Sequence, residues 1–407
     1  MAEKTLRQTF SGIADAMRSS GIIGAGETVR PLDMGARIEG AATVPRLFAD
    51  QVAEFTVDYI PSFAFYDLNN LKTVHSNASV IGESAFSATD ANRSDGQGIH
   101  TFTSSRDFEI GQYAFRNCFD LDWATFPWDK VRALSGSAFA LKKGVNPSVK
   151  VDTVTLPALT TLSGGLEYWC SRRVDLPSVT EVTRFDVGLK TALTEIRAEN
   201  LERTGMAINS ANGCNLITLH CPKLKYFYGI QGNSSAGVHL RYVGNTLDEY
   251  GNPSWTDLSG IETASGSLAY YMNSLVWKHK WCYLPNLTNL GEGQTFRGCA
   301  SSNLRGVWLG PNDTLAYLGS YCFYQCPSQL KVFLPRKSKI YGNKSSGSYN
   351  SFATCYVPAS LLDEYKAATN WSGMTSRLVG LTDEQFAAVE QQIRDGVDAD
   401  AITIPTA

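Results

Sequence analysis

The sequence has little charge. Only 18% of its 407 residues are Asp, Glu, Lys or Arg, below the roughly 25% of an average soluble protein. The formal net charge is −3 and no basic stripe is present, which argues against nucleic-acid binding. The surface is therefore expected to be rich in uncharged polar groups, from Ser, Thr, Asn, Gly and Tyr.

Long apolar runs are also missing. No segment approaches the about 18 consecutive apolar residues that a membrane-spanning helix needs. The chain opens on Met1-Ala2-Glu3-Lys4 and a polar helical pattern, without the apolar region and cleavage site of a secretory signal. We expect synthesis in the cytoplasm without secretory export, and no membrane insertion.

Signatures of metal and redox chemistry are absent too. The nine cysteines include no paired CxxC spacing, and the five histidines are far apart without an HExxH pattern. We expect free, mostly buried thiols, and neither a metal nor a cofactor.

No motif identifies a catalytic residue, and the GxSxG pattern of a nucleophile elbow does not occur. A glycosidase needs two carboxylates about 5–10 Å apart. Asp107 with Glu109 and Asp248 with Glu249 are candidates by proximity alone. Nothing else distinguishes either pair, so we expect a protein that is not an enzyme.

What the sequence does contain is a repeat, clearest as IGQYAFRNCFDL at residues 110–121. Copies occur as Ile60-Pro61 before Ala64-Phe65, Ile81-Gly82 before Ala85-Phe86, and Leu318-Gly319 before Cys322-Phe323. A repeating unit of roughly twenty-odd residues is too short to bury its apolar face by itself and can bury it only against the next copy. The pattern therefore predicts a solenoid.

Each repeated position has an expected structural role. The leading Ile or Leu and the Ala-Phe pair should stack as ladders inside the coil. The following Gly or Pro should permit a tight corner. Phe115, Phe296 and Phe323 are each followed three residues later by a cysteine, a small residue that suits a crowded inner corner.

The middle of the chain uses a second form of the repeat. Leu156-Pro157-Ala158-Leu159-Thr160 returns as Leu176-Pro177-Ser178-Val179-Thr180. Alternating apolar residues before such a Leu-Pro pair predict a short strand that leads into a turn.

These units resemble the BspA type of leucine-rich repeat, whose consensus combines Ile-Gly-x-x-Ala-Phe, a Cys and a Leu-Pro strand. The resemblance implies a repeat solenoid that is mainly β, with irregular or short helical turns and short α-helical elements at both termini. We place the solenoid at residues 46–356, with an irregular insertion at about 229–282.

The N-terminal segment, residues 1–45, is predicted to form two short helices that cap the first repeat, attach the chain to a larger assembly, or do both. The apolar residues expected to make the attachment are Leu6, Phe10, Ile13, Met17, Leu32 and Ile38. Residues 13–38, with Arg30-Pro31-Leu32-Asp33, resemble a helical segment of tail and minor structural proteins from phages of Gram-positive gut bacteria. This resemblance implies a virion protein that binds other virion proteins through its N-terminal segment.

At the other end, residues 357–380 are predicted to cap the solenoid through a helix at Ala359–Ala368 and Trp371. This part is similar to the closing repeat of BspA-type phage proteins. Residues 381–407 should form a helix and tail, because Thr382 and Gln385 make a capping box. The apolar face of that helix packs either on the coil or on a partner subunit; it consists of Phe386, Val389 and Ile393.

Aromatic residues gather in the irregular region among Ser, Asn and Gly; they are Tyr250, Trp255, Tyr270, Tyr271, Trp277 and Trp281. Tyr and Trp offer large contact areas at low entropic cost, so these rings are a candidate surface for a host cell-surface glycan or protein. The alternative is that they fill a degenerate stretch of core.

The resulting hypothesis is a phage tail or tail-fibre component that adheres to the host. Weak single sites become effective when many copies act together, and a homo-oligomer, for example a trimer, is expected. One alternative is a purely architectural virion protein of the baseplate or head. The other is a bacterial surface adhesin of the BspA kind.

Overall fold

The protein is described from a computed structural model as two compact units. Unit 1 comprises Met1–Ser178 with Lys190–Leu193, and unit 2 comprises Val179–Leu189 with Thr194–Ala407. The described residues are 52–406 except 56, 69–70, 89–97, 142–146, 165, 185–190, 205–207, 211–216, 228–229, 233–239, 245–254, 265–275, 291–295, 297–298, 300–301, 311–316, 319–321, 339–340 and 343–351.

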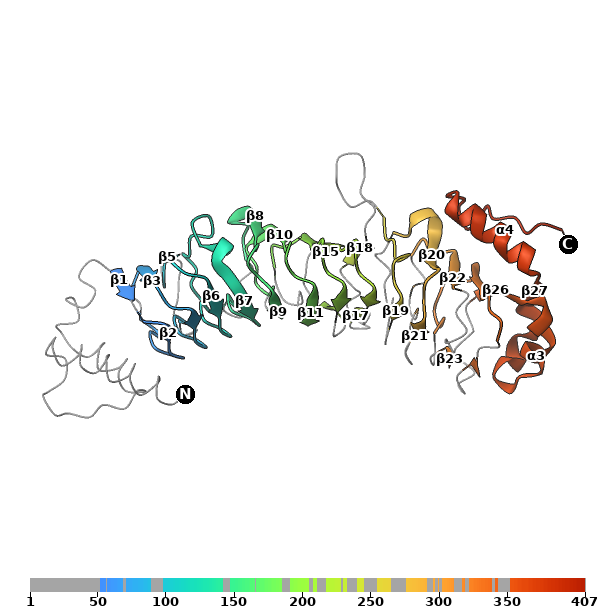
Figure 1. Ribbon diagram of the computed structural model, residues 1–407, viewed down its shortest axis with the longest axis horizontal. Helices are drawn as coiled ribbons and strands as arrows, with labels where there is room; N and C mark the ends of the chain where they lie inside the picture. Colours follow the sequence, from blue (N-terminus) through green and yellow to red (C-terminus); the bar gives the residue numbers. More distant parts are fainter. Residues whose placement is uncertain are drawn as a thin grey trace, which may run out of the picture. The chain divides into compact units, whose positions relative to one another are not determined.

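Unit 1 is a coil of short parallel strands (Figure 1). One sheet contains β1 (Val52–Phe55), β3 (Thr73–Ser76) and β5 (Thr101–Ser104). A second contains β2 (Tyr59–Ile60), β4 (Val80–Ile81), β6 (Phe108–Ile110), β7 (Val131–Ser135) and β9 (Thr161–Ser163). The strands β8 (Val151–Thr155) and β10 (Ser171–Asp175) pair with each other, and a 3₁₀ turn, η2 (Trp128–Lys130), precedes β7.

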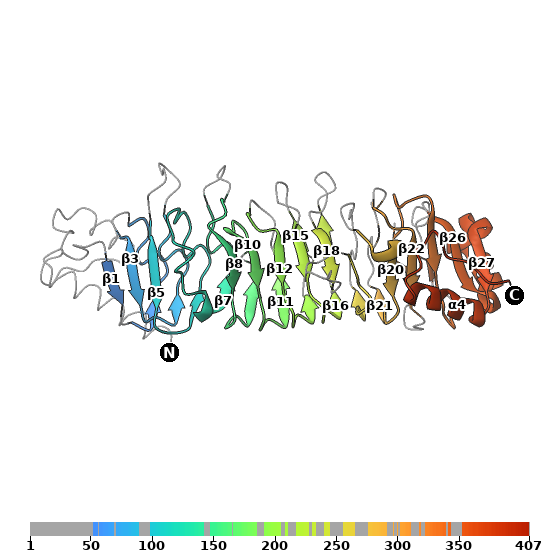
Figure 2. The same ribbon diagram turned by 90° about the horizontal axis from the view of Figure 1, so that it is seen from above.

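Unit 2 repeats this arrangement, with its strands side by side in Figure 2. Its first sheets are β11 (Glu181–Arg184), β13 (Arg203–Thr204), β16 (Tyr226–Phe227), β19 (Thr263–Ala264) and β21 (Asn289–Leu290), and β12 (Glu195–Arg197), β15 (Ile217–His220) and β18 (Leu240–Gly244). Another holds β20 (Trp281–Leu284), β22 (Gly306–Leu309), β24 (Leu330–Phe333), β26 (Phe352–Pro358) and β27 (Leu378–Leu381). Two pairs complete it, β14 (Ile208–Ser210) with β17 (Ile230–Gly232) and β23 (Tyr317–Leu318) with β25 (Tyr341–Gly342).

The ladders predicted from the repeat are confirmed in unit 1. The leading residues stand in register, with Ile60 opposite Ile81 and Ile81 opposite Ile110, and all three are buried. The phenylalanines stack one turn apart at centroid distances of 5.5, 5.5 and 5.4 Å along the series Phe65, Phe86, Phe115 and Phe139. Each turn thus buries its apolar residues against the next.

The predicted role of the repeat glycines needs a correction. Gly82 and Gly111 do not have positive φ, so backbone freedom is not what they supply. A Cβ at Gly82 would lie 2.5 Å from the Ser62 amide nitrogen and 2.8 Å from the Ile60 oxygen. The left-handed residues of the corner come two positions later, at Ser84 and Tyr113, with φ of 52° and 55°. Glycine is required because the backbones of adjacent turns approach closely.

The irregular region continues the coil where the structure describes it. In unit 2, β18 pairs in parallel with β15 across a register shift at Ile217/Thr218. β19 pairs in register with β16 and with β21. The predicted insertion at about 229–282 therefore contains coil strands, and departs from the repeat sequence more than from the repeat fold.

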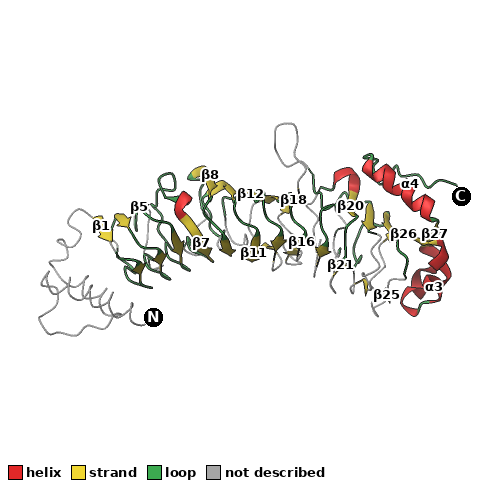
Figure 3. Ribbon diagram, viewed as in Figure 1, coloured by secondary structure: helices red, strands yellow, loops and turns green. Residues whose placement is uncertain are grey.

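The C-terminal end combines strands and helices (Figure 3). The predicted helix at Ala359–Ala368 is a 3₁₀ turn, η4 (Ala359–Leu361), followed by α3 (Leu362–Ala367) and η5 (Thr369–Arg377). Trp371 is buried against Tyr365, with ring centroids 4.9 Å apart. Strand β27, which the sequence did not predict, adds one more parallel strand beside β26. Helix α4 (Asp383–Arg394) begins with the predicted capping box between Thr382 and Gln385.

The eight described cysteines are free and buried. The Cys118 thiol donates to the Phe86 carbonyl of the preceding turn at 3.4 Å, and Cys326 donates to Phe296 at 2.8 Å. Burial raises the pKa of Cys170 to about 11 and the pKa of Cys355 further still. Such thiols are held as the unreactive protonated form at neutral pH.

We therefore predict slow thiol chemistry in the folded protein. At pH 8 the thiolate fraction of a group such as Cys170 should fall about 100-fold below that of an ordinary cysteine, because its pKa is raised. Ellman's reagent should react rapidly with at most one thiol of the native chain, Cys214, and with all nine after unfolding in guanidinium chloride. Rapid reaction of two or more native thiols would contradict the buried assignment.

Candidate binding surfaces

The inward and outward positions of the strands differ in chemistry. In unit 1, Val154 of β8 lies opposite Val174 of β10, and both are fully buried. The neighbouring outward pair is Thr153 opposite Arg173. The Arg173 guanidinium donates two hydrogen bonds of 2.8 Å to Asp175 on its own strand. The outward residues are thus polar and ordered, but they do not repeat.

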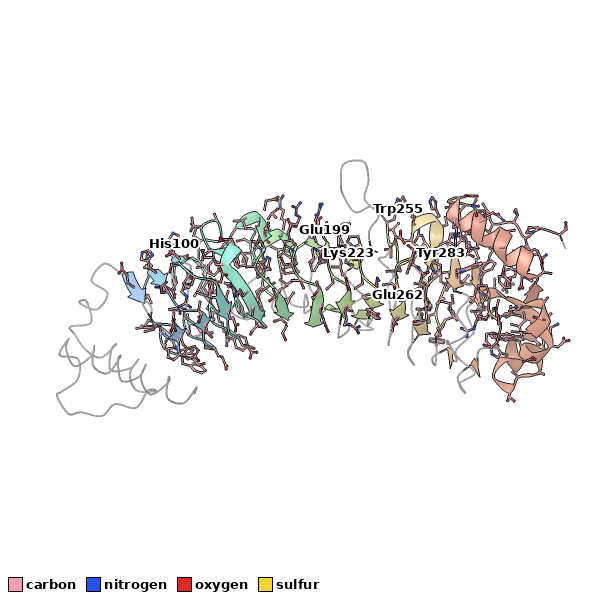
Figure 4. The ribbon with its side chains drawn as sticks, in the orientation of Figure 1. His100, Glu199, Lys223, Trp255, Glu262 and Tyr283 are labelled. Carbon is pink, nitrogen blue, oxygen red and sulfur yellow. The ribbon has the colours of Figure 1, made fainter. Side chains whose placement is uncertain are left out.

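Unit 2 shows the same separation in β12 and β15. Ile196 lies opposite Leu219 in the core, whereas Arg197 pairs with Glu195 at the partly exposed edge of the strand and lies opposite His220, which is buried. His220 Nε2 is 3.2 Å from Glu199 Oε1. In the following turn Lys223 donates to Asn200 at 2.7 Å. Figure 4 shows Glu199 and Lys223 on this part of the coil.

Near the C-terminus the outward positions become aromatic. Tyr283, Trp308, Phe333 and Tyr356 lie opposite one another on β20, β22, β24 and β26. Their ring centroids are 6.3, 5.8 and 4.4 Å apart in that order. Helix α4 covers this row, and its three apolar residues are Phe386, Val389 and Ile393. Of the two arrangements considered for the helix, packing on the coil is the one observed.

Polar contacts fix the covering helix. The Tyr283 hydroxyl donates to Glu390 at 2.7 Å, and Arg394 donates to Glu390 at 2.8 Å and to the same hydroxyl at 3.3 Å. Burial, and then the bond to Glu390, raise the pKa of Tyr283 to about 12. The phenol therefore remains a neutral donor throughout the physiological range.

The tail after α4 is held by the residues around η3 (Lys278–Lys280). The Trp281 indole donates to the Val397 carbonyl at 3.0 Å, and the Ala399 amide donates to the His279 carbonyl at 3.1 Å. Lys280 lies 3.1 Å from Asp398 and 2.8 Å from Asp400. Hydrogen bonds to these two carboxylates raise the pKa of Lys280.

A pocket of about 390 Å³ opens where η3 meets the end of α4. Figure 1 shows this 3₁₀ turn, drawn in yellow ahead of β20, beside the end of α4. Three segments supply its polar groups, which include Asp257, Ser259, Lys278, His279, Arg394 and Asp395. His279 and Lys280 have positive φ, 48° and 62°, a conformation that costs a non-glycine residue about 1–3 kcal/mol.

The predicted aromatic surface is only partly a surface. Trp277 and Trp281 are 1% and 4% exposed and belong to the core, so neither ring is available for stacking on a ligand; for these two the core alternative holds. Trp255 is 42% exposed. Tyr250, Tyr270 and Tyr271 lie outside the described residues.

The other predicted residues can be placed as follows. Asp107 accepts two hydrogen bonds from Arg132, at 2.8 and 2.5 Å, so it is one half of an ion pair. Asp248 and Glu249 lie outside the described residues, as do all the predicted attachment residues of segment 1–45. Within the described part of the chain, no group of His, Cys, Asp and Glu could hold a metal ion. No described helix is long and apolar enough to cross a membrane.

The pocket itself was not predicted. Asp257 follows the exposed Trp255 by two residues, but η3 and α4 are more than a hundred residues apart in sequence. Lys278, His279 and Lys280 form a short basic run between Trp277 and Trp281, and such a run gives no sign of left-handed backbone. The capping box at Thr382 predicted the start of helix α4, but it did not indicate that the end of α4 would lie beside η3.

Short parallel strands, stacked interior ladders and tight corners define a leucine-rich-repeat solenoid. More particularly, residues 51–144 and 279–368 match the BspA type leucine rich repeat region, in six copies. The residues between these stretches, 145–278, have no match, although the strands described there in each unit are also parallel.

Comparison with solved structures shows a further similarity. A leucine rich cell surface protein from Faecalibacterium prausnitzii A2-165 is similar over 72% of this chain and 85% of that chain, with 17% sequence identity and a TM-score of 0.28. No curated protein matches the chain.

Proposed function

We propose that this chain is a non-catalytic adhesive protein that uses the coil as a scaffold for a binding surface. The observation that supports this most is the contrast between positions. Inward residues repeat from turn to turn, as at Val154 and Val174, whereas the outward residues beside them differ, as at Thr153 and Arg173. A scaffold that displays a variable face needs this separation.

We further propose that the chain is carried on a phage virion, in the tail or a tail fibre. Residues 1–45 would bind other virion proteins, and the outer face of the coil would contact a host glycan or protein. The resemblance of residues 13–38 supports this carrier. A homo-oligomer on a particle would multiply weak contacts by about 10²–10⁴.

A bacterial cell surface is the second candidate carrier. The six BspA-type repeats favour it as much as the first, because the repeat does not depend on what carries it. Antibodies against the full chain, applied to cells that produce the protein, distinguish the virion from the bacterial cell surface as the carrier. Label on released particles supports the virion, and its loss on deletion of residues 1–45 supports the attachment role. Label on the cell envelope alone would refute the virion.

Adhesion is tested with the full chain coupled to fluorescent beads and presented to whole bacteria. We expect the beads to bind, and the double variant Arg197→Ala with Lys223→Ala to bind about tenfold less, because it removes one exposed and one partly exposed cation from unit 2. Lys366→Ala removes an exposed cation on α3 and is the matched control. Adhesion would be refuted if beads that carry the wild-type chain bind none of the bacterial strains in which the protein is produced.

A further inference from the structure

We propose that the pocket between η3 and the end of α4 binds a neutral saccharide, a hexose unit of a surface glycan. This inference rests on the proposed adhesive function and names a site for it. Nothing in the repeat pattern itself requires a pocket at this position.

The exposed tryptophan is the first argument. All eight tryptophans are described, and only Trp255 is exposed, at 42%. Its neighbours in sequence, Thr256 and Asp257, line the pocket, and Figure 4 shows Trp255 beside the same part of unit 2 as Tyr283. A pyranose has one face of C–H groups, and stacking that face on the indole removes apolar area of both from water.

The charges that line the pocket are the second argument. Asp257 and Asp395 contribute two negative charges, which Lys278 and Arg394 balance. A neutral ligand whose hydroxyls both donate and accept can use both kinds of group. An anionic or a cationic ligand would meet like charges as well as opposite ones here, and Arg394 is already paired with Glu390. Neither ion would therefore gain the net attraction that a lining of one sign of charge gives.

The polar groups are also held in place before a ligand arrives. The Ser259 amide donates to Asp257 at 3.0 Å, and the Gln391 side chain donates to Asp395 at 2.9 Å. Glu390 fixes Arg394 at 2.8 Å. The Lys278 ammonium has no ion pair with the described residues, which leaves it for a ligand hydroxyl. Preorganised groups lower the entropic cost of binding.

Size restricts the ligand to one or two sugar units. The volume of about 390 Å³ lies in the lower part of the range for small-molecule sites, about 300–1,000 Å³. A longer glycan would therefore place its terminal or a single branching unit here and leave the remainder outside.

Saturation-transfer NMR on the full chain tests the proposal, with methyl glycosides of glucose, galactose and mannose as probes and glucuronate as the acidic comparison. We expect transfer to the ring C–H protons of at least one neutral glycoside and none to glucuronate. Trp255→Ala and Lys278→Met should each reduce the signal at least fivefold. Asp363→Asn and Lys366→Met, at exposed positions on α3, are the matched controls and should leave it unchanged.

The unfolding temperature of each variant shows whether it is folded. If Trp255→Ala does not fold, Lys278→Met still tests the pocket. Absence of transfer to every neutral glycoside, transfer to glucuronate alone, or transfer in both folded pocket variants that equals that of the wild type would overturn the proposal. The bead assay is read separately. Beads that bind cells while the glycosides give no transfer would refute this site and leave adhesion standing.

Discussion

Substitution of Gly82 or Gly111 by alanine should lower the free energy of unfolding of the coil by about 3 kcal/mol. At both positions the new Cβ would meet backbone atoms of the preceding turn within 2.8 Å. Backbone cannot rotate away as a flexible side chain can, so one turn must move from the next and strain the hydrogen bond between them. The Gly82 amide donates one such bond to Ile60 at 2.8 Å. The shift in the urea midpoint measures the loss.

Gly136→Ala is the matched control for that prediction. Its Cβ would lie 3.7 Å from the nearest atom, the Ser163 carbonyl oxygen, which is ordinary contact. Because alanine also reduces the entropy of the unfolded chain, this change should be neutral or stabilise by up to about 1 kcal/mol. Equal losses at Gly82, Gly111 and Gly136 would show that the close approach of turns is not the reason for glycine.

Val389→Asp should release helix α4 from the coil and cost at least about 3 kcal/mol, because an unpaired carboxylate would be buried. Val389 is fully buried in the cluster with Trp308 and Phe333. Release would expose the aromatic row to water and promote self-association. Increased binding of anilinonaphthalenesulfonate and a lower unfolding temperature are the expected measurements.

Ala387→Asp provides the control on the same helix. Ala387 is exposed and two residues away, so it receives the same charge on the solvent side of α4. We expect less than about 0.5 kcal/mol of change there. If both variants bind the dye equally, the charge on the helix acts by another route than exposure of the aromatic row.

Much of the fold was predictable because its stabilising contacts are periodic. Ile60, Ile81 and Ile110 recur in the sequence and stand in register in the sheet, and the capping box at Thr382 marked the start of α4. Strand β27 was not predictable, because it follows a helical cap and pairs with β26 without a repeat motif. The reason for glycine at position 82 was also hidden, since it lies in the backbone of another turn.

The candidate site was much less predictable. Trp255, Trp277 and Trp281 appear equivalent in sequence, yet one is exposed and two are buried. Strand alternation and the docked tail determine that difference: Trp281 is covered because its indole bonds to Val397, which lies over a hundred residues away. The residues that line the pocket come from 256–259, 278–283 and 393–396, and no local pattern relates the last segment to the first two.

The hydrogen bonds between consecutive turns have a mechanical consequence. In unit 1 the amides of Phe65, Phe86 and Phe115 each donate to a carbonyl of the following turn, so these backbone bonds hold a turn to its immediate neighbour. Tension applied through the chain would therefore peel turns one after another from an end. Each freed residue would lengthen the tether by about 3.3–3.6 Å. An adhesive protein of this kind would unfold in steps under tension and so dissipate a sudden force before its contact with the surface broke.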